Sequence, residues 1–179
     1  MAELIKILPG ADFWAGGPEV SYDAEKFLTE NSEFKGVMVG EGEETFKELA
    51  GYYVEKNPQD LKDMTGICYR DGDQIIHNGW RQIMDLSSIP FIYKDLSEFK
   101  NRIIYYESSR GCPFSCSYCL SSIDKKLRFR DLDLVKKELQ FFLDHRVPQV
   151  KFVDRTFNCK HEHAMTIWKY ILELSLIHI

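Results

Sequence analysis

Two short apolar runs that end in glycine organise the first third of the chain. The run "ADFWAGG" covers residues 11–17, and "GVMVGEGEE" covers residues 36–44. Each precedes a stretch with helical spacing, the first beginning at Asp23 and carrying Ala24, Phe27 and Leu28, the second carrying Phe46, Leu49, Ala50 and Tyr53. Strands that alternate with helices predict a parallel sheet. Two strands alone do not make a stable sheet, so either the sheet continues elsewhere in the chain or part of it is missing.

The middle of the chain has a different pattern. Two runs typical of β-strands in residues 66–78 join around Asp71-Gly72, which is a strong hairpin signal. Residues 85–99 mix Asp, Ser and Pro with scattered apolar side chains and show no clear period. We therefore expect a connecting segment here, with a domain boundary between residues 60 and 100.

The last third alternates again between strand and helix. The pattern predicts a strand at 101–109, a cysteine-rich loop, a helix capped by Asp131, a strand at 149–157 and a final helix. The helices carry Leu132, Val135, Leu139 and Phe142 in the first case and Ala164, Ile167, Trp168, Ile171 and Leu172 in the second. This order is typical of the opening of an α/β barrel, in which sites lie at the C-terminal ends of the strands.

Composition and charge narrow the classes of protein. The 179 residues are 44% hydrophobic, 28% charged and 13% aromatic, which is typical of a globular chain. A net charge of -5 argues against nucleic-acid binding through bulk charge. The basic run Lys125, Lys126, Arg128 and Arg130 is interpreted as a solvated face, with a substrate clamp as the alternative. His161 and His163 stand two residues apart, so a helix would not place them on one face for a metal.

The sequence favours a cytoplasmic protein. No apolar run approaches the roughly 20 residues needed to span a bilayer, and the N-terminus lacks the features of a secretory signal. In that compartment, five cysteines indicate metal ligands or free thiols rather than disulfides.

Three of those cysteines lie within eight residues. Cys112, Cys116 and Cys119 follow the spacing Cys-x3-Cys-x2-Cys. Three thiolates on one loop can bind three irons of a [4Fe–4S] cluster and leave the fourth iron open to another ligand. The alternative is a zinc site that takes its fourth ligand from elsewhere, although zinc favours Cys-x2-Cys pairs. Cys68 and Cys159 are interpreted as ordinary thiols.

The segment "RGCPFSCSYC" resembles the cluster loop of the radical S-adenosylmethionine (radical SAM) enzymes. The resemblance implies that SAM chelates the open iron and is cleaved by an electron to methionine and a 5′-deoxyadenosyl radical. It also implies that Tyr118 lines the SAM adenine, through its backbone. The segment "FVDRTFN" resembles the second barrel strand of one subgroup, which makes Asp154 a candidate contact of the SAM amino group. The alternative is an ion pair of Asp154 with Arg155 at the surface or the strand end.

Residues 14–49 resemble the second half of the cobalamin-binding domain that precedes the barrel in that subgroup. The resemblance implies that Gly16-Gly17 and Gly40-Glu41-Gly42 border the nucleotide tail of cobalamin. The motif Asp-x-His-x-x-Gly, which in some members supplies a lower ligand to cobalt, is not in the sequence. The later barrel strands, which in the family hold the ribose and adenine of SAM and most of the substrate pocket, are not found either.

The predicted fold class is therefore α/β: the end of a Rossmann-like cobalamin-binding domain, then the first two βα units of a partial radical SAM (β/α)6 barrel. The expected divisions are 1–60 for the cobalamin-binding part, 61–100 for a β-hairpin and linker, and 101–179 for the barrel part. The final letters "LSLIHI", residues 174–179, resemble the translation of the transposase mosaic-end adapter used in DNA library preparation. The chain is therefore expected to be an internal piece of a larger protein.

The expected function is that of a radical SAM enzyme of an anaerobic bacterium. Its expected cofactors are a [4Fe–4S] cluster and SAM, and the use of cobalamin is left open. The reaction would be either methyl transfer through cobalamin or a rearrangement. The implied partners are a small-molecule substrate and an electron donor such as flavodoxin or ferredoxin, with no membrane and no nucleic acid. The alternatives are a non-catalytic iron–sulfur or zinc module, and a truncated chain without function of its own.

Overall fold

The computed structural model describes residues 6–54, 60–120 and 126–174. The chain divides into two compact units, Met1–Ile83 and Met84–Ile179. Within the described ranges, no helix combines the length and the apolar character that crossing a membrane requires.

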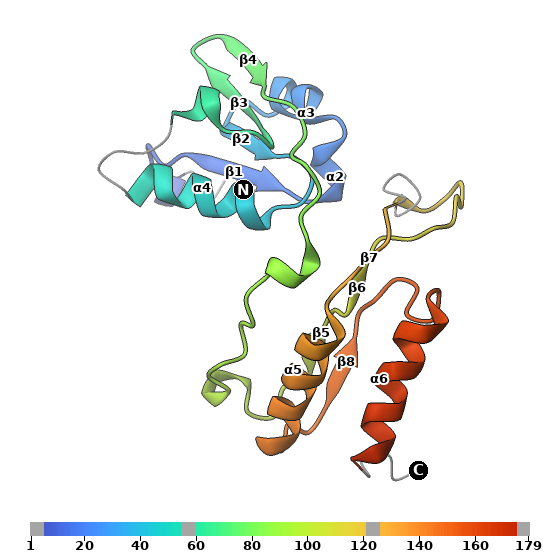
Figure 1. Ribbon diagram of the computed structural model, residues 1–179. Coiled ribbons are helices and arrows are strands. Elements are labelled where there is room, and N and C mark those ends of the chain that lie inside the picture. The colour runs from blue at the N-terminus through green and yellow to red at the C-terminus, as the bar shows by residue number, and fades with distance from the viewer. Residues whose placement is uncertain (1–5, 55–59, 121–125, 175–179) are drawn as a thin grey trace. The chain divides into compact units, whose positions relative to one another are not determined.

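The first unit is built on one mixed sheet with the strand order β1-β2-β3-β4 (Figure 1). Its strands are β1 (Phe13–Gly16), β2 (Phe34–Met38), β3 (Ile67–Asp71) and β4 (Gln74–His77), and its helices are α2 (Pro18–Ser21), α3 (Ala24–Glu30) and α4 (Glu43–Val54). The first two strands are parallel, as the sequence pattern predicted, whereas β3 and β4 run antiparallel to their neighbours. The sheet is therefore not purely parallel.

The hairpin of β3 and β4 belongs to this sheet and is not a separate connecting element. Its first strand pairs with β2 from Met38 opposite Ile67 to Gly36 opposite Tyr69. Ile67, Cys68 and Tyr69 are all buried, so β3 needs cover on both faces and a partner at its edge. The free edge of β2 supplies that partner, which a local turn signal could not reveal.

Two helices cover opposite faces of the sheet. Alternate residues of a strand point to opposite faces, and Cys68 packs with Leu28 of α3 while Ile67 packs with Leu49 of α4. The buried side of α4 consists of Thr45 and Leu49. The predicted apolar face of this helix is thus rotated, since Phe46 and Tyr53 are exposed.

The second unit contains two parallel, paired strands, β5 (Ile104–Tyr106) and β8 (Val150–Phe152) (Figure 1). The helix α5 (Leu132–Asp144) lies between them along the chain. The helix α6 (His161–Glu173) follows β8. As predicted, Asp131 caps α5 by accepting hydrogen bonds from the backbone N–H groups of Asp133 and Leu134. The buried members of the core are Ile104, Tyr106, Val135, Leu139, Phe142 and Ile167.

The other face of this small sheet carries apolar side chains that remain exposed. Ile103, Tyr105 and Val153 lie there, one residue out of phase with the buried Ile104 and Tyr106. On α6, Trp168 and Leu172 are also exposed. Two βα units are therefore packed on one side only.

Candidate functional site

The cysteine loop leaves the sheet at the C-terminal end of β5 and returns to α5. Its two arms pair as a short antiparallel ladder of β6 (Ser109–Arg110) and β7 (Arg128–Phe129), with Ser109 opposite Phe129. Between the arms lie Cys112, Cys116 and Cys119, of which Cys116 is exposed and the other two are half-buried. The backbone N–H of Cys119 donates to the carbonyl of Cys116 at 3.1 Å, which makes a turn between the second and third cysteine.

Glycine is required at the base of this loop. Gly111 has φ +95°, a conformation that side chains with a Cβ rarely adopt. A Cβ at this position would also collide with the backbone carbonyl of Lys126 on the returning arm. The two arms can therefore close directly before Cys112 only because residue 111 is glycine.

The donor set of the loop fits an iron–sulfur cluster with three protein ligands. All three thiols lie on one solvent-accessible loop, spaced four and three residues apart. In the part of the chain that the structure describes, no three Cys, His, Asp or Glu side chains gather as a ready metal site. Metal ligands are rarely preformed without the metal, and the assignment of the three cysteines as ligands stays a prediction.

Asp154 lies beside the start of the cysteine loop. Its Oδ1 accepts hydrogen bonds from the hydroxyls of Ser108 at 2.8 Å and Ser109 at 2.6 Å, and its Oδ2 accepts the backbone N–H of Ser108 at 3.3 Å. The pairing of β8 with β5 brings the two segments together. By contrast, the side chain of Tyr118 is 90% exposed, and its expected role at the SAM adenine stays a prediction.

His163 is a buried polar residue, which the sequence pattern had marked only as an unsuitable metal-binding partner of His161. Its side chain is 2% exposed, packs against the ring of Phe129 with 4.8 Å between centroids, and leaves Nε2 without a hydrogen-bond partner. Burial lowers the pKa of His163, although a hydrogen bond with the Ser108 backbone and the charge of Asp154 oppose the shift. The signal in the sequence was its spacing of four residues from Ile167, on the buried stripe of α6.

The predicted cobalamin glycines lie together at one edge of the first sheet. Gly16 ends β1 and Gly17 follows it, and Gly40-Glu41-Gly42 come after β2. The carboxyl ends of the two strands are adjacent because the strands are parallel. The buried hydroxyl of Ser21 joins the two turns: it donates to the carbonyl of Gly17 at 2.8 Å and accepts the N–H of Gly40 at 3.2 Å. The structure therefore brings all five positions to one place.

This glycine edge is partly open and partly covered. No atom lies within 4 Å of a Cβ built on Gly17 or Gly42, whereas one on Gly40 would lie 3.2 Å from the indole of Trp80. Trp80 packs in turn against Tyr22, with 5.4 Å between ring centroids. No local pattern predicts these two aromatic residues beside the glycines, because Trp80 is distant along the chain.

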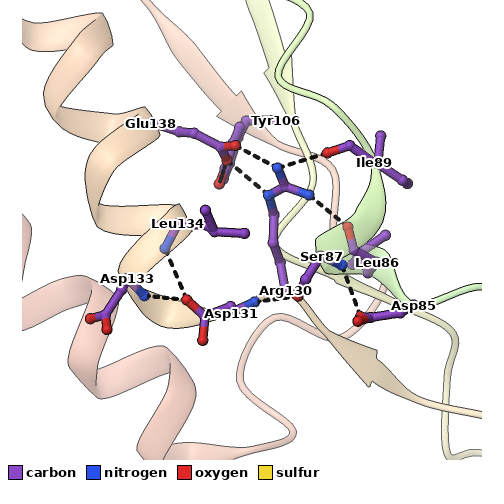
Figure 2. A network of polar contacts seen from close by, with 10 residues as sticks. All are labelled: Asp85, Leu86, Ser87, Ile89, Tyr106, Arg130, Asp131, Asp133, Leu134 and Glu138. Atoms are coloured by element: carbon purple, nitrogen blue, oxygen red, sulfur yellow. Dashed lines mark hydrogen bonds and ion pairs between the residues drawn. The ribbon is translucent and has the colours of Figure 1, made fainter.

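Arg130 departs from the basic run that was interpreted as a solvated face. It is buried, and its guanidinium forms an ion pair with Glu138 of α5 and donates to the carbonyls of Leu86 and Ile89 (Figure 2). The carboxylate of Glu138 also accepts the hydroxyl of Tyr106 at 2.6 Å. Arg130 is thus a structural residue and is not available as a substrate clamp.

The chain resembles several known proteins in sequence. No protein-family model matches the chain. The chain is 30% identical over 162 residues to the uncharacterized methyltransferase PH0819 of Pyrococcus horikoshii, covering 85% of this chain and 35% of that protein. It is 25% identical over 172 residues to the cobalamin-dependent radical SAM methyltransferase TokK of Streptomyces tokunonensis, covering 88% of this chain and 25% of that protein.

Solved structures show the same fold. The cobalamin-dependent S-adenosylmethionine radical enzyme OxsB, with aqua-cobalamin and S-adenosylmethionine bound, matches with a TM-score of 0.69 at 21% identity, over 89% of this chain and 24% of that one. The radical S-adenosylmethionine methyltransferase TsrM of Kitasatospora setae matches with a TM-score of 0.67 at 19% identity, over 95% of this chain and 34% of that one.

These comparisons confirm the resemblance to radical SAM enzymes with an N-terminal cobalamin-binding domain and the predicted α/β fold class. The chain spans between a quarter and about a third of the length of these relatives.

Proposed function

We propose that the second unit holds a [4Fe–4S] cluster through Cys112, Cys116 and Cys119 and that the intact enzyme uses it with SAM for radical chemistry. The observation that carries the proposal is the position of the three cysteines: one loop, closed at its base by β6 and β7, at the C-terminal end of a parallel strand. Sites in α/β barrels lie at this end of the strands. When bound, the cluster would supply the electron for reductive cleavage of SAM to methionine and the 5′-deoxyadenosyl radical.

The residues of this chain have separate tasks in the proposal. The three thiolates hold the cluster and leave one iron open for SAM. The ladder of β6 and β7, with Gly111 inside it, closes the loop behind them. Phe114, Tyr118 and Leu120 are exposed apolar side chains on the same loop, and they would help to keep water away once SAM and the remaining barrel cover them.

The first unit is proposed to border cobalamin through Gly16, Gly17, Gly40, Glu41 and Gly42. The support is the meeting of these residues at one sheet edge, together with the open space above Gly17 and Gly42. Two relatives are named as cobalamin-dependent. The reaction of the intact enzyme is then methyl transfer through cobalamin or a rearrangement, on a small molecule, in the cytoplasm, with a flavodoxin or ferredoxin as electron donor.

Anaerobic reconstitution of the chain with iron and sulfide tests the cluster. We expect close to four irons and four sulfides per chain, and after reduction an EPR signal that SAM perturbs because it binds the open iron. A colourless protein that retains one zinc would contradict the proposal and favour a zinc module. A cluster whose EPR signal is indifferent to SAM would favour a non-catalytic iron–sulfur module.

Folding of the chain is checked by circular dichroism and size exclusion on the same preparations. A compact monomer that melts cooperatively would argue against a truncated chain that cannot fold. Without it, a negative result with iron would say nothing about the loop.

A further inference from the structure

We propose that Asp154 is a positioning residue for the cysteine loop and not a direct contact of SAM, an inference that rests on the proposed function of that loop. Among the described residues, the three hydrogen bonds to its carboxylate come from Ser108 and Ser109. Oδ1 accepts both hydroxyls, at 2.8 Å and 2.6 Å. A carboxylate oxygen with two such donors has both of its lone pairs engaged.

The two serines need this carboxylate. Ser108 and Ser109 are 0% and 1% exposed, and a buried hydroxyl without a partner is destabilising. Hydrogen bonds to an ionised acceptor are roughly twice as strong as those between neutral groups. Asp154 therefore binds both serine side chains from the end of β8. The three residues come together because β8 pairs with β5, although Asp154 is distant from the serines along the chain.

Ser108 is the point where three elements meet. Its carbonyl accepts the N–H of Arg130 from the returning arm of the loop at 2.9 Å. The buried ring of His163 contacts its backbone from α6. Its hydroxyl and its N–H bind Asp154. Ser109, the next residue, begins the ladder that closes the loop three residues before Cys112.

Among the described residues, the groups that face Asp154 support its carboxylate through hydrogen bonds and not through an ion pair. Burial lowers the pKa of His163, so its imidazole is uncharged near neutral pH. The remaining donors are hydroxyls and an amide. The carboxylate thus stabilises the two serines, and the serines fix where the loop starts and at what angle its first cysteine leaves the sheet.

The experiment compares Asp154→Asn and the milder Ser109→Ala with the control Asp133→Asn, which changes an exposed carboxylate of α5. Hydrogen exchange of the apo chain is measured by mass spectrometry on the peptides that contain β6 and β7. We expect both test variants to exchange these amides roughly tenfold faster, which corresponds to about 1.4 kcal/mol of local opening free energy. The control should match the unchanged chain.

Iron release to a chelator is then measured on the reconstituted proteins without SAM. If Asp154 positions the loop, both test variants lose iron faster than the control before any SAM is added. If Asp154→Asn leaves exchange and iron release unchanged and alters only the effect of SAM on the EPR signal, Asp154 is a SAM contact and the inference is overturned.

The two failures are distinguishable. If the unchanged chain takes up no iron, the proposed cluster fails, while hydrogen exchange of the apo chain still decides whether Asp154 holds the loop. If Asp154→Asn does not fold by circular dichroism, Ser109→Ala decides alone, because it removes one hydroxyl and leaves two of the three hydrogen bonds in place.

Discussion

Arg130 and Glu138 form a buried, two-pronged ion pair in the second unit, each side chain being 7% exposed. The Nε of Arg130 donates to Oε2 of Glu138 at 2.9 Å, and its Nη2 donates to Oε1 of the same carboxylate (Figure 2). Since Arg130 also donates to the carbonyls of Leu86 and Ile89, the pair attaches the segment that opens the second unit to α5. The end of the cysteine loop is anchored in the same place.

Removing one member of this pair should destabilise the protein strongly. Arg130→Met leaves the carboxylate of Glu138 buried without its partner, and such a loss costs roughly 3–5 kcal/mol. The double variant Arg130→Met with Glu138→Leu should recover most of that loss, because no buried charge remains. Urea unfolding at neutral pH measures both. Equal losses in the single and double variants would show that the hydrogen bonds to Leu86 and Ile89, and not the charge, matter.

Local signals made much of the fold predictable. The hairpin turn at Asp71-Gly72 and the Asp131 cap of α5 were both confirmed, because each depends on residues adjacent in the chain. The pairing of the hairpin with β2 was not predictable, since an exposed strand edge leaves no mark in a local pattern. Arg130 looked like one more basic residue, because its partner Glu138 becomes visible only once α5 packs against β5.

The candidate site divides in the same way. The cysteine spacing predicted that three thiols share a loop, and the glycine pairs predicted turns after two adjacent strands. The contact between Asp154 and Ser109 depends on the register of β5 with β8, which no local pattern contains. The covering of Gly40 by Trp80 likewise depends on how the chain continues after β4.

Substitution of each loop cysteine should abolish the cluster with little effect on the fold. Cys112→Ser, Cys116→Ser and Cys119→Ser each remove one of three proposed thiolate ligands, and two remaining ligands hold a cluster poorly. Cys159→Ser is the matched control outside the loop. Iron content and the absorbance of the reconstituted proteins measure the effect. Equal iron in all four variants would show that the iron is not bound by this loop.

Gly111→Ala should open the base of the cysteine loop. The alanine would have to keep a positive φ, and its Cβ would collide with the Lys126 carbonyl. We therefore expect the free energy of unfolding to fall by roughly 3 kcal/mol and the iron uptake to be poor. Gly72→Ala is the control, because it has φ +57° but nothing within 4 Å of its Cβ, and strain alone costs about 1–2 kcal/mol. Thermal melts with iron analysis compare the two. Similar losses would mean that only the positive φ matters at residue 111.

Gly42→Leu should interfere with cobalamin and leave the first unit folded. Space is open above Gly42, and loss of a glycine before α4 costs the helix only about 1 kcal/mol. A leucine there would occupy the position proposed for the nucleotide tail. Titration with hydroxocobalamin, followed by absorbance, should show weaker binding than for the unchanged chain, and Gly42→Ser should bind nearly normally. Unaltered binding in Gly42→Leu would place cobalamin elsewhere or exclude it from this unit.

Cys68 should make the stability of the first unit depend on pH in the alkaline range. Burial raises the pKa of its thiol from 9.0 to about 11. Since the folded state holds this proton more tightly than the unfolded state, the contribution is fully present below pH 9.0 and is lost as the pH rises towards about 11. Cys68→Ala should reduce the decline of stability between pH 9.0 and about 11, because the titrating thiol is removed. It should also lower stability at neutral pH, because a packed side chain is lost. Urea unfolding across that range measures both slopes, with Cys159→Ala as the control.

A thiol reagent at pH 8 should also modify Cys116 well before Cys68, because the first side chain is exposed and the second is buried. Equal rates at the two thiols would show that β3 opens readily and that the core around Cys68 is not the stable part of the sheet.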